Sequence, residues 1–279
     1  MLYNLREYHR PTDLGEAIRL LRREDIHTVA IGGGVSVVGE GTPEIEAVVD
    51  LDGLGLDFLE HEGSILRIGT MVRIQTLVET LDSVASGSLA ETARRMAGWH
   101  VRNASTLGGA LASGNIHAPL CVMLAALDAT VTLYDGKTEQ TSTWQVLAER
   151  VRQSGLHGEL IIAITFDAPP GIGAAYEQVA RTPADQPIVS AAAVARPGSR
   201  GQVVVTTVVG GLLHGLATAK GEISEGRLDD VVAQLADFGE DEAAYQSDYR
   251  GSASYRRAAA MILARRTMGR AVKEVDLAK

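Results

Sequence analysis

Apolar residues in the first fifty positions form one helical face and two short continuous runs. Four of them recur at the spacing of one helical face: Leu14, Ala17, Ile18 and Leu21. Thr12 or Asp13 can cap such a helix, and a glutamate follows three residues after Asp13. Apolar runs at 28–31 and 46–51 follow the helix, and a glycine run comes directly after the first of them, so the opening fifty residues are predicted to form a small β-α-β unit.

The same kinds of pattern predict the elements of the remaining chain. The middle of the chain is predicted to hold a hairpin at 58–68, helices at 74–81, 88–96, 119–129 and 144–151, and strands at 130–134 and 160–166. Ala-Pro-Pro-Gly at 168–171 interrupts the pattern and indicates a domain boundary. Beyond it the pattern predicts strands at 174–179, 188–195 and 202–210, then helices at 228–238 and 252–275. In the last helix we expect Tyr255, Ala259, Ile262 and Leu263 to face inward, and Arg256, Arg257, Arg265 and Arg266 to face outward.

The net charge and the single cysteine exclude several classes of function and of site. The chain has 26 basic and 35 acidic residues and a net charge of −9, which argues against nucleic acid or an anionic membrane as the main partner. Its one cysteine, Cys121, excludes an internal disulfide and a cysteine-ligated iron–sulfur cluster within this chain. Cys121 lies in an apolar helix, so we expect a buried thiol. The start of the chain lacks an apolar signal region and no long apolar span follows, so we expect a cytoplasmic protein without membrane insertion.

Two glycine runs are the candidate chemistry. The first, 32–36, follows a predicted strand, but it lacks the Rossmann spacing, a clear helix directly after it and the lysine of a P-loop. Its consecutive amides can form an anion-binding nest, and a tight turn remains the alternative. The second run, 106–109, offers a hydroxyl and two amides that we expect to be unhindered. Two such runs are best explained by one extended ligand, such as a dinucleotide, whose pyrophosphate needs many donors.

Several motifs, in the same order along the chain, resemble those of one family. They are Tyr8-His-Arg-Pro-Thr, the loop Ile31–Val37, Val101-Arg-Asn-x-x-Thr106-Leu-Gly-Gly109, Leu124-x-x-Leu127-Asp128-Ala129, Arg181 with Asp185, and Gly251-Ser-Ala-Ser-Tyr255-Arg256-Arg257. Over nearly its whole length the chain resembles the FAD-binding (medium) subunit or domain of the xanthine dehydrogenase/carbon monoxide dehydrogenase family of molybdenum hydroxylases.

This resemblance implies an α+β fold. It would consist of a two-part FAD-binding region of the vanillyl-alcohol-oxidase (PCMH) type over 1–168, with subdomains 1–55 and 56–168. A C-terminal domain of the CO-dehydrogenase flavoprotein type would follow over 172–279, with a three-stranded antiparallel sheet and helices.

The resemblance also implies a cofactor, a role and partners. The cofactor would be FAD, and its binding residues would be Gly32, Gly33, Gly34, Val35, Ser36, Thr106, Leu107, Gly108, Gly109, Ala110 and Ile161, with Ile162 beside the last. The chain would pass electrons from the iron–sulfur clusters of a small subunit to an external acceptor, while a large subunit with a molybdenum cofactor oxidises the substrate. The flavin would carry the chemistry, so no catalytic side chain is expected.

Four positions depart from the family pattern and keep alternatives open. Val35, Ala110, Pro119 and Glu177 each stand where relatives have a polar or, at the last, a positive group. A subunit that has lost the flavin and serves as a scaffold is therefore one alternative, and a stand-alone flavin oxidoreductase is another.

A few polar residues near the motifs are candidates for lesser roles. His100 and His117 flank the second run without a carboxylate at ligand spacing, so no metal site is predicted. His117 is expected at the surface of a loop, with a place beside a flavin as the alternative. Arg102 and Asn103 are expected to fix a turn, and Arg181 and Asp185 to pair with each other. The arginines of the last helix are expected on a solvated face or on a docking surface for partner subunits.

Overall fold

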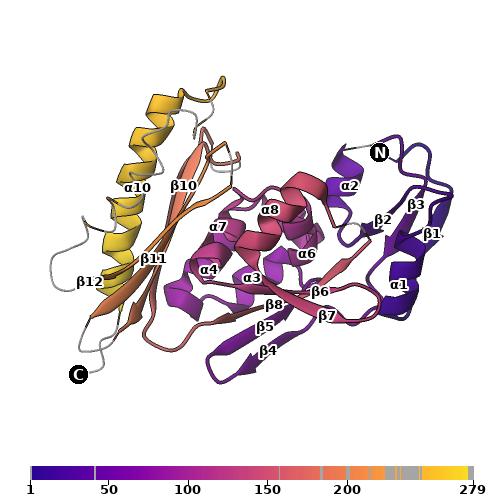
Figure 1. Ribbon diagram of the computed structural model, residues 1–279, viewed down its shortest axis with the longest axis horizontal. Helices are drawn as coiled ribbons and strands as arrows, with labels where there is room; N and C mark the ends of the chain where they lie inside the picture. Colours follow the sequence, from indigo (N-terminus) through magenta and orange to yellow (C-terminus); the bar gives the residue numbers. More distant parts are fainter. Residues whose placement is uncertain are drawn as a thin grey trace. The chain divides into compact units, whose positions relative to one another are not determined.

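The computed structural model divides the chain into two compact units, each drawn from several segments (Figure 1). It describes residues 2–40, 42–156, 158–182, 185–198, 202–213, 215–223, 230, 233, 245 and 247–275. The first unit consists of Met1–Thr76, Trp99–Asn115 and Ala129–Phe166. The second consists of Leu77–Gly98, Ile116–Asp128 and Asp167–Lys279.

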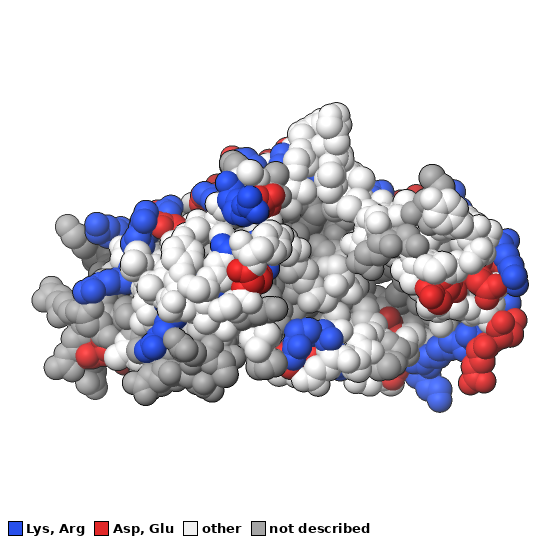
Figure 2. Space-filling view, turned by 90° about the horizontal axis from the view of Figure 1, so that it is seen from above, with Lys and Arg blue, Asp and Glu red and all other residues white. Residues whose placement is uncertain are grey.

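The first unit begins with the expected β-α-β segment. Strands β1 (Glu7–His9), β3 (Ala47–Asp50) and β2 (Thr28–Ile31) form a parallel sheet in that order, with helix α1 (Leu14–Leu21) before β2. The predicted start of α1 is confirmed, because the Asp13 carboxylate accepts a hydrogen bond of 2.8 Å from the Glu16 amide. Opposite charges share the surface here, as Figure 2 shows at the end that carries β1 and α1 in Figure 1.

A five-stranded sheet completes the first unit. Its order is β4 (Leu59–Glu62), β5 (Ile65–Gly69), β8 (Leu160–Asp167), β6 (Thr130–Tyr134) and β7 (Glu139–Thr143). Helix α8 (Trp144–Ser154) follows β7. The second glycine run lies after the short helix α5 (Trp99–Ala104) and forms the start of helix α6 (Leu107–Ala112). One buried cluster joins this sheet to α1 and β3: Ala17, Ile18, Val49, Leu56, Met71, Leu160 and Ile162. The two sheets of this unit therefore share a core.

The second unit is built on an antiparallel sheet with a helix layer on each face. The sheet has four strands in the order β12 (Ala217–Ile223), β11 (Val203–Gly210), β10 (Val189–Pro197) and β9 (Gly173–Val179). Helix α10 (Ala253–Glu274) packs along one face. Helices α4 (Ser88–Arg94) and α7 (Pro119–Ala126) pack on β9, β10 and β11. Helix α3 (Ile74–Thr80) and the 3-10 turn η1 (Val84–Gly87) precede α4.

The C-terminal sheet thus has one strand more than the three that were expected. The missed strand β12 contains Ala-Thr-Ala-Lys-Gly-Glu, which has little of the branched apolar character that marks a strand. Strand β7 was missed for a related reason, because it is a polar edge strand of Glu-Gln-Thr-Ser-Thr. The predicted helix 228–238 lies outside the described residues, apart from Asp230 and Ala233.

The predicted orientation of the last helix is wrong at several positions. Tyr255 and Ile262 are 48% and 59% exposed, whereas Arg256 is 3% exposed. The helix instead buries a stripe of mostly small residues: Ala260, Leu263, Ala264, Thr267, Met268 and Ala271. Small side chains let the helix approach closely, and a Cβ at Gly173 of β9 would lie 1.9 Å from the Ala271 carbonyl oxygen. Arg265 and Arg266 are exposed as expected.

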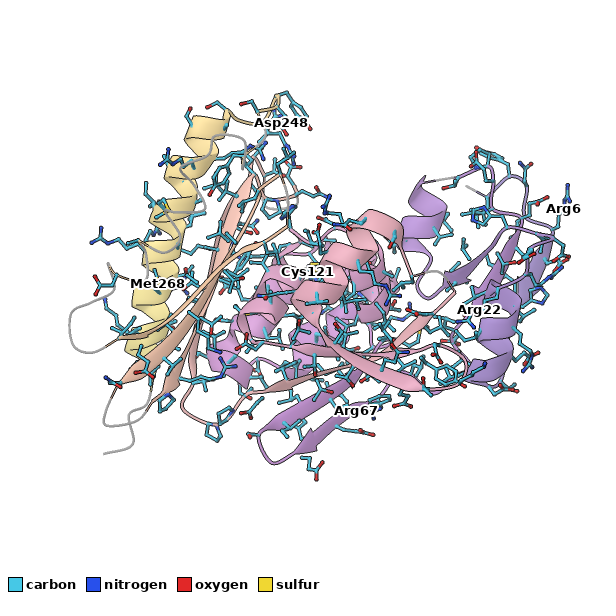
Figure 3. All side chains as sticks on the ribbon, in the orientation of Figure 1. Arg6, Arg22, Arg67, Cys121, Asp248 and Met268 are labelled. Carbon is cyan, nitrogen blue, oxygen red and sulfur yellow. The ribbon has the colours of Figure 1, made fainter. Side chains whose placement is uncertain are left out.

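Helix α7 is buried on all sides, which confirms the expectation for its cysteine. Every residue from Pro119 to Ala126 is buried, and Cys121 lies among the packed helices (Figure 3). Desolvation raises the pKa of the Cys121 thiol to about 12, so it is an inert core residue at neutral pH. No helix among the described segments is long and apolar enough to span a bilayer.

Candidate functional site

The first glycine run links strand β2 to a helix that the sequence did not predict. Residues Gly32–Gly34 leave the strand, and α2 (Val35–Glu40) begins directly afterwards. Gly34 has a φ of 75°, a conformation that suits glycine and allows this sharp exit. The run is therefore the start of a strand–turn–helix motif, and Ser36 lies in the first helical turn.

Amides of this run have no acceptor. Within the described part of the chain, none of the amides of Gly33, Gly34, Val35 and Ser36 donates a hydrogen bond. The first amides of any helix lack a partner inside the helix, which explains their state here. Gly33, Gly34 and Ser36 are half-buried and Val35 is exposed, so these donors lie near the surface. Adjacent free amides of this kind can bind an anion.

The second run begins helix α6 and uses its amides internally. The Gly108 amide donates to the Thr70 carbonyl at 2.7 Å, and the Leu107 amide donates to the Val72 carbonyl at 2.9 Å. The Gly109 amide donates to Thr106 Oγ1 at 3.1 Å, which makes Thr106 the N-cap of α6. The expectation of two unhindered amides in this run is therefore wrong.

The structure brings the two glycine runs into direct contact. A Cβ at Gly33 would lie 1.6 Å from the Ala104 carbonyl oxygen, and a Cβ at Gly32 would lie 2.7 Å from Thr106 Oγ1. These glycines are thus required by the packing of one run on the other. The expectation that both runs form one site agrees with this contact, and the tight-turn alternative explains part of their glycine content.

Thr70 connects the second run to strand β8. Its hydroxyl donates to the Ile161 carbonyl at 2.8 Å, while a Cβ at Gly108 would lie 2.7 Å from its Cβ. Ile161 itself is buried, with 4% exposure. Thr70 therefore links the predicted site residue Ile161, through a hydrogen bond, to Gly108, through a packing contact.

Arg73 joins the same cluster, although sequence analysis did not single it out. Its Nη1 donates to the Ala104 carbonyl at 2.5 Å, and the same atom would lie 2.9 Å from a Cβ at Gly33. Its backbone forms an isolated antiparallel bridge with Thr106. An arginine outside any motif gives no sequence signal, because the contact joins segments far apart in the chain.

The two histidines differ in their surroundings. His117 is half-buried in the second unit, and its Nδ1 accepts a hydrogen bond of 3.1 Å from the Gly211 amide, so it is not a surface loop residue. His100 is exposed and lies edge-on to Trp99 at a centroid distance of 5.0 Å. The described residues contain no group of His, Cys, Asp and Glu that could hold a metal ion.

Arg102 and Asn103 make structural contacts in helix α5, as expected. Arg102 Nε donates to Gln75 Oε1 at 2.8 Å, and Asn103 Nδ2 donates to the Trp99 carbonyl at 2.9 Å. These bonds tie the helix to α3 and to its own first turn. Both residues are therefore structural, as predicted, but they hold a helix and not the expected turn.

The predicted pairing of Arg181 with Asp185 is replaced by other contacts. Asp185 Oδ2 accepts a hydrogen bond of 3.1 Å from the Thr182 amide, which closes a turn. The Arg181 guanidinium lies 6.0 Å from the centroid of the Tyr249 ring. Each residue thus fixes a separate piece of local structure.

The negative charge of Glu177 is compensated within its own unit. Its carboxylate forms ion pairs with Arg266 at 3.0 Å and with Arg270 at 3.4 Å, both from α10. Glu177 faces α10, whereas the neighbouring Tyr176 and Gln178 lie on the opposite side of β9 and bond to each other at 2.8 Å. Glu177 departs from the family pattern, and the two arginines of α10 balance its negative charge.

Thr106→Ala tests the capping of the second run. We expect the free energy of unfolding to fall by about 1 kcal/mol, because the Gly109 amide loses the acceptor that the buried Thr106 side chain supplies. Urea unfolding followed by circular dichroism measures this change. Thr106→Ser keeps the hydroxyl and serves as the control, and equal losses in both variants would contradict the capping role.

Comparison with known proteins finds relatives over both units. Residues 3–168 match the family described as the FAD binding domain in molybdopterin dehydrogenase. The chain is 30% identical over 135 residues to the uncharacterized protein YgfM of Escherichia coli (strain K12), so it spans about half the length of that relative, with 48% of this chain and 51% of YgfM aligned.

Longer matches cover almost the whole chain. It is 27% identical to the nicotine 6-hydroxylase medium subunit of Paenarthrobacter nicotinovorans, over 94% of this chain and 95% of that subunit. A chain in the crystal structure of the Cu,Mo-CO dehydrogenase, cyanide-inactivated form, is similar with a TM-score of 0.83 and 27% identity. That match covers 99% of this chain and 100% of the other.

Proposed function

Because the chain belongs to the family of FAD-binding domains in molybdopterin dehydrogenases, we propose that it passes electrons from iron–sulfur clusters of a partner subunit to an external acceptor. The chain is an FAD-binding medium subunit of the molybdenum hydroxylase family, which consists of oxidoreductase complexes. The family resemblance drawn from the sequence motifs and the expected α+β fold are both confirmed. The direction of electron flow through this chain and the identity of its partner subunits are what we propose here.

The first glycine run is the proposed donor set for the FAD diphosphate. The free amides of Gly33, Gly34, Val35 and Ser36 carry this assignment, because they lie together at a helix start without an acceptor. Gly32 completes the turn by packing on Thr106. When bound, FAD supplies the reversible electron transfer, and the protein positions it.

The second run shapes the site. The amides of Leu107, Gly108 and Gly109 donate hydrogen bonds to acceptors within the protein, so they are not available to a ligand. We propose that the run forms the wall against which the first run packs, with Thr106, Leu107, Gly108 and Ala110. Exposed Gly109 carries no side chain, so a ligand can approach its backbone closely. Ile161 is proposed to contribute apolar surface beside the flavin. No side chain of the site needs to act as an acid, base or nucleophile.

The chain is proposed to have two domains and two kinds of partner. A cofactor domain over 1–168, with parts 1–55 and 56–168, is supported by the family match to 3–168, and 172–279 is proposed as the C-terminal domain. The segments 77–98 and 116–128 lie within the first range but belong to the same compact unit as the C-terminal domain. The proposed partners are a small subunit with iron–sulfur clusters and a large subunit with a molybdenum cofactor. The single cysteine supports this arrangement, because the clusters must then reside in another chain.

Loss of the flavin is a second candidate, and one observation favours it. The second run offers no free amide at Leu107, Gly108 or Gly109, and Val35 and Ala110 add no polar side chain. A family member in this state would serve as a scaffold subunit. The free amides of the first run favour the flavoprotein.

Purification of the chain with its visible spectrum tests the proposal. We expect absorption bands of an oxidised flavin and release of FAD on denaturation, or stoichiometric uptake of added FAD. We also expect co-purification with chains that contain molybdenum and iron–sulfur clusters, whose reduction by substrate bleaches the flavin. A colourless chain that takes up no FAD would contradict the flavoprotein and support the scaffold. A flavoprotein that purifies alone and oxidises a small molecule itself would contradict the electron-transfer role.

A further inference from the structure

Arg73 lies between the two glycine runs. Its backbone bridges to Thr106, and the amide of the following residue, Ile74, donates to the Ser105 carbonyl at 3.0 Å. These bonds fix the residue against the second run, at the junction between strand β5 and helix α3. Its backbone is therefore not free to move away from the site.

The Arg73 side chain reaches the first run. Its Nη1 donates to the carbonyl of Ala104, the last residue of helix α5, at 2.5 Å. The same nitrogen would lie 2.9 Å from a Cβ at Gly33, which places the guanidinium directly beside that glycine. A cation at the end of α5 also interacts favourably with the helix dipole.

The charge of Arg73 has no acidic partner within the described residues. Six other arginines of the first unit do have a carboxylate partner: Arg6, Arg10, Arg23, Arg67, Arg150 and Arg152. A guanidinium carries five N–H donors, and the one bond that Arg73 makes goes to a neutral carbonyl. Arg73 is half-buried, so the remaining donors and the positive charge lie beside the free amides of the first run.

We infer that Arg73 binds the diphosphate of the cofactor and supplies the positive charge that neither glycine run contains. This inference rests on the proposed function of the site. The planar fork of a guanidinium can bind two oxygens of a phosphate at once, and such charge-assisted bonds are shorter and stronger than neutral ones. The amides of Gly33–Ser36 and the Arg73 guanidinium together form one anion site. The chain has a net charge of −9, which repels an anionic ligand, and the positive charge of Arg73 counteracts this repulsion at the site.

Arg73→Gln in the full chain tests the inference. Glutamine keeps a polar N–H donor on a shorter side chain and removes the charge. We expect the Kd for FAD, measured by quenching of flavin fluorescence, to rise roughly 10- to 100-fold, the loss of one charge-assisted hydrogen bond. Between 50 and 500 mM KCl the unmodified chain is expected to lose affinity, whereas the variant changes less. Arg73→Lys keeps the charge, so it should retain most of the affinity and the salt dependence.

Arg67→Gln is the matched control, because it removes the same charge from β5. Arg67 pairs with Glu60 and lies over the Phe58 ring, at the surface (Figure 3), and the variant should bind FAD like the unmodified chain. Inorganic pyrophosphate is the second probe, and it should protect the unmodified chain from thermal unfolding more than Arg73→Gln.

The outcomes separate this inference from the proposed function. FAD binding that is equal in the unmodified chain and in Arg73→Gln, with equal salt dependence, would overturn the role of Arg73 alone. A chain that binds neither FAD nor pyrophosphate would overturn both. If Arg73→Gln does not fold, an affinity of the unmodified chain for FAD that is independent of KCl would overturn the inference.

Discussion

Gly33→Ala is expected to abolish FAD binding and to cause the largest loss of stability of any single methyl group added at the site. The new Cβ would lie 1.6 Å from the Ala104 carbonyl oxygen and 2.9 Å from Arg73 Nη1, whereas real Cβ contacts essentially never fall below 3.0 Å. The obstacle is backbone, so β2 and α5 must separate and the two runs lose their contact. We expect the free energy of unfolding to fall by about 3 kcal/mol or more.

Gly39→Ala, in the helix α2 that follows the first run, provides the control. A Cβ at Gly39 would meet nothing within 4 Å, and alanine in a helix is favoured over glycine by about 0.5–1 kcal/mol. We therefore expect unchanged FAD affinity and equal or slightly higher stability. Urea unfolding and flavin-fluorescence titration measure both variants, and tight FAD binding by Gly33→Ala would contradict the geometry of the site.

Arg256→Met is expected to cost about 2–3 kcal/mol of unfolding free energy, because it removes a charge-assisted hydrogen bond and leaves the half-buried Asp248 carboxylate with Arg250 as its remaining cation. Arg256 is 3% exposed, and its guanidinium donates to Asp248 Oδ1 at 2.5 Å and to the Ile188 carbonyl at 3.2 Å. Asp248 lies near the N-terminal end of α10 (Figure 3). Arg266→Met is the surface control, for which a loss below about 1 kcal/mol is expected.

The same ion pair predicts how stability depends on pH. Desolvation acts to raise the pKa of Asp248, but the Arg250 amide and the Arg256 and Arg250 guanidiniums outweigh it and hold that pKa well below its usual range. A lowered folded-state pKa stabilises the protein above the unfolded value of about 3.9, and this contribution is lost as the pH falls below it. The stability difference between the unmodified chain and Arg256→Met should therefore be full at pH 7 and narrow below about pH 4. A difference that stays constant down to pH 2.5 would contradict this assignment.

Local sequence signals predicted most of the elements, for identifiable reasons. Helix α1 and its Asp13 cap, the hairpin of β4 and β5, and the buried helix α7 all follow from spacing and turn residues within a few positions. Strands without apolar periodicity, β7 and β12, gave no such signal. The inward face of helix α10 was predicted wrongly because its buried stripe contains three alanines, a threonine and an arginine, which contribute little to an apolar pattern.

The candidate site could be predicted in its location but not in its donors. Two glycine runs stand out in the sequence, and their position in one unit follows from the fold. Whether an amide of Leu107 or Gly108 is free depends on the carbonyls of Val72 and Thr70, more than thirty positions away. Arg73 went unnoticed because its contact with the Ala104 carbonyl is equally distant in the chain. Tertiary packing determines such contacts between distant segments, and the spacing of residues along the sequence does not predict them.

Helices α4 and α7 have a consequence for synthesis on the ribosome. Both are made well before strands β9, β10 and β11, on which they pack, because the sheet comes from the C-terminal part of the chain. Until those strands emerge, the fully apolar α7 has no sheet to cover it and is exposed to aggregation. A nascent or truncated chain that ends near residue 168 is therefore expected to need a chaperone, and the second unit can close only after strands β9, β10 and β11 have been synthesised.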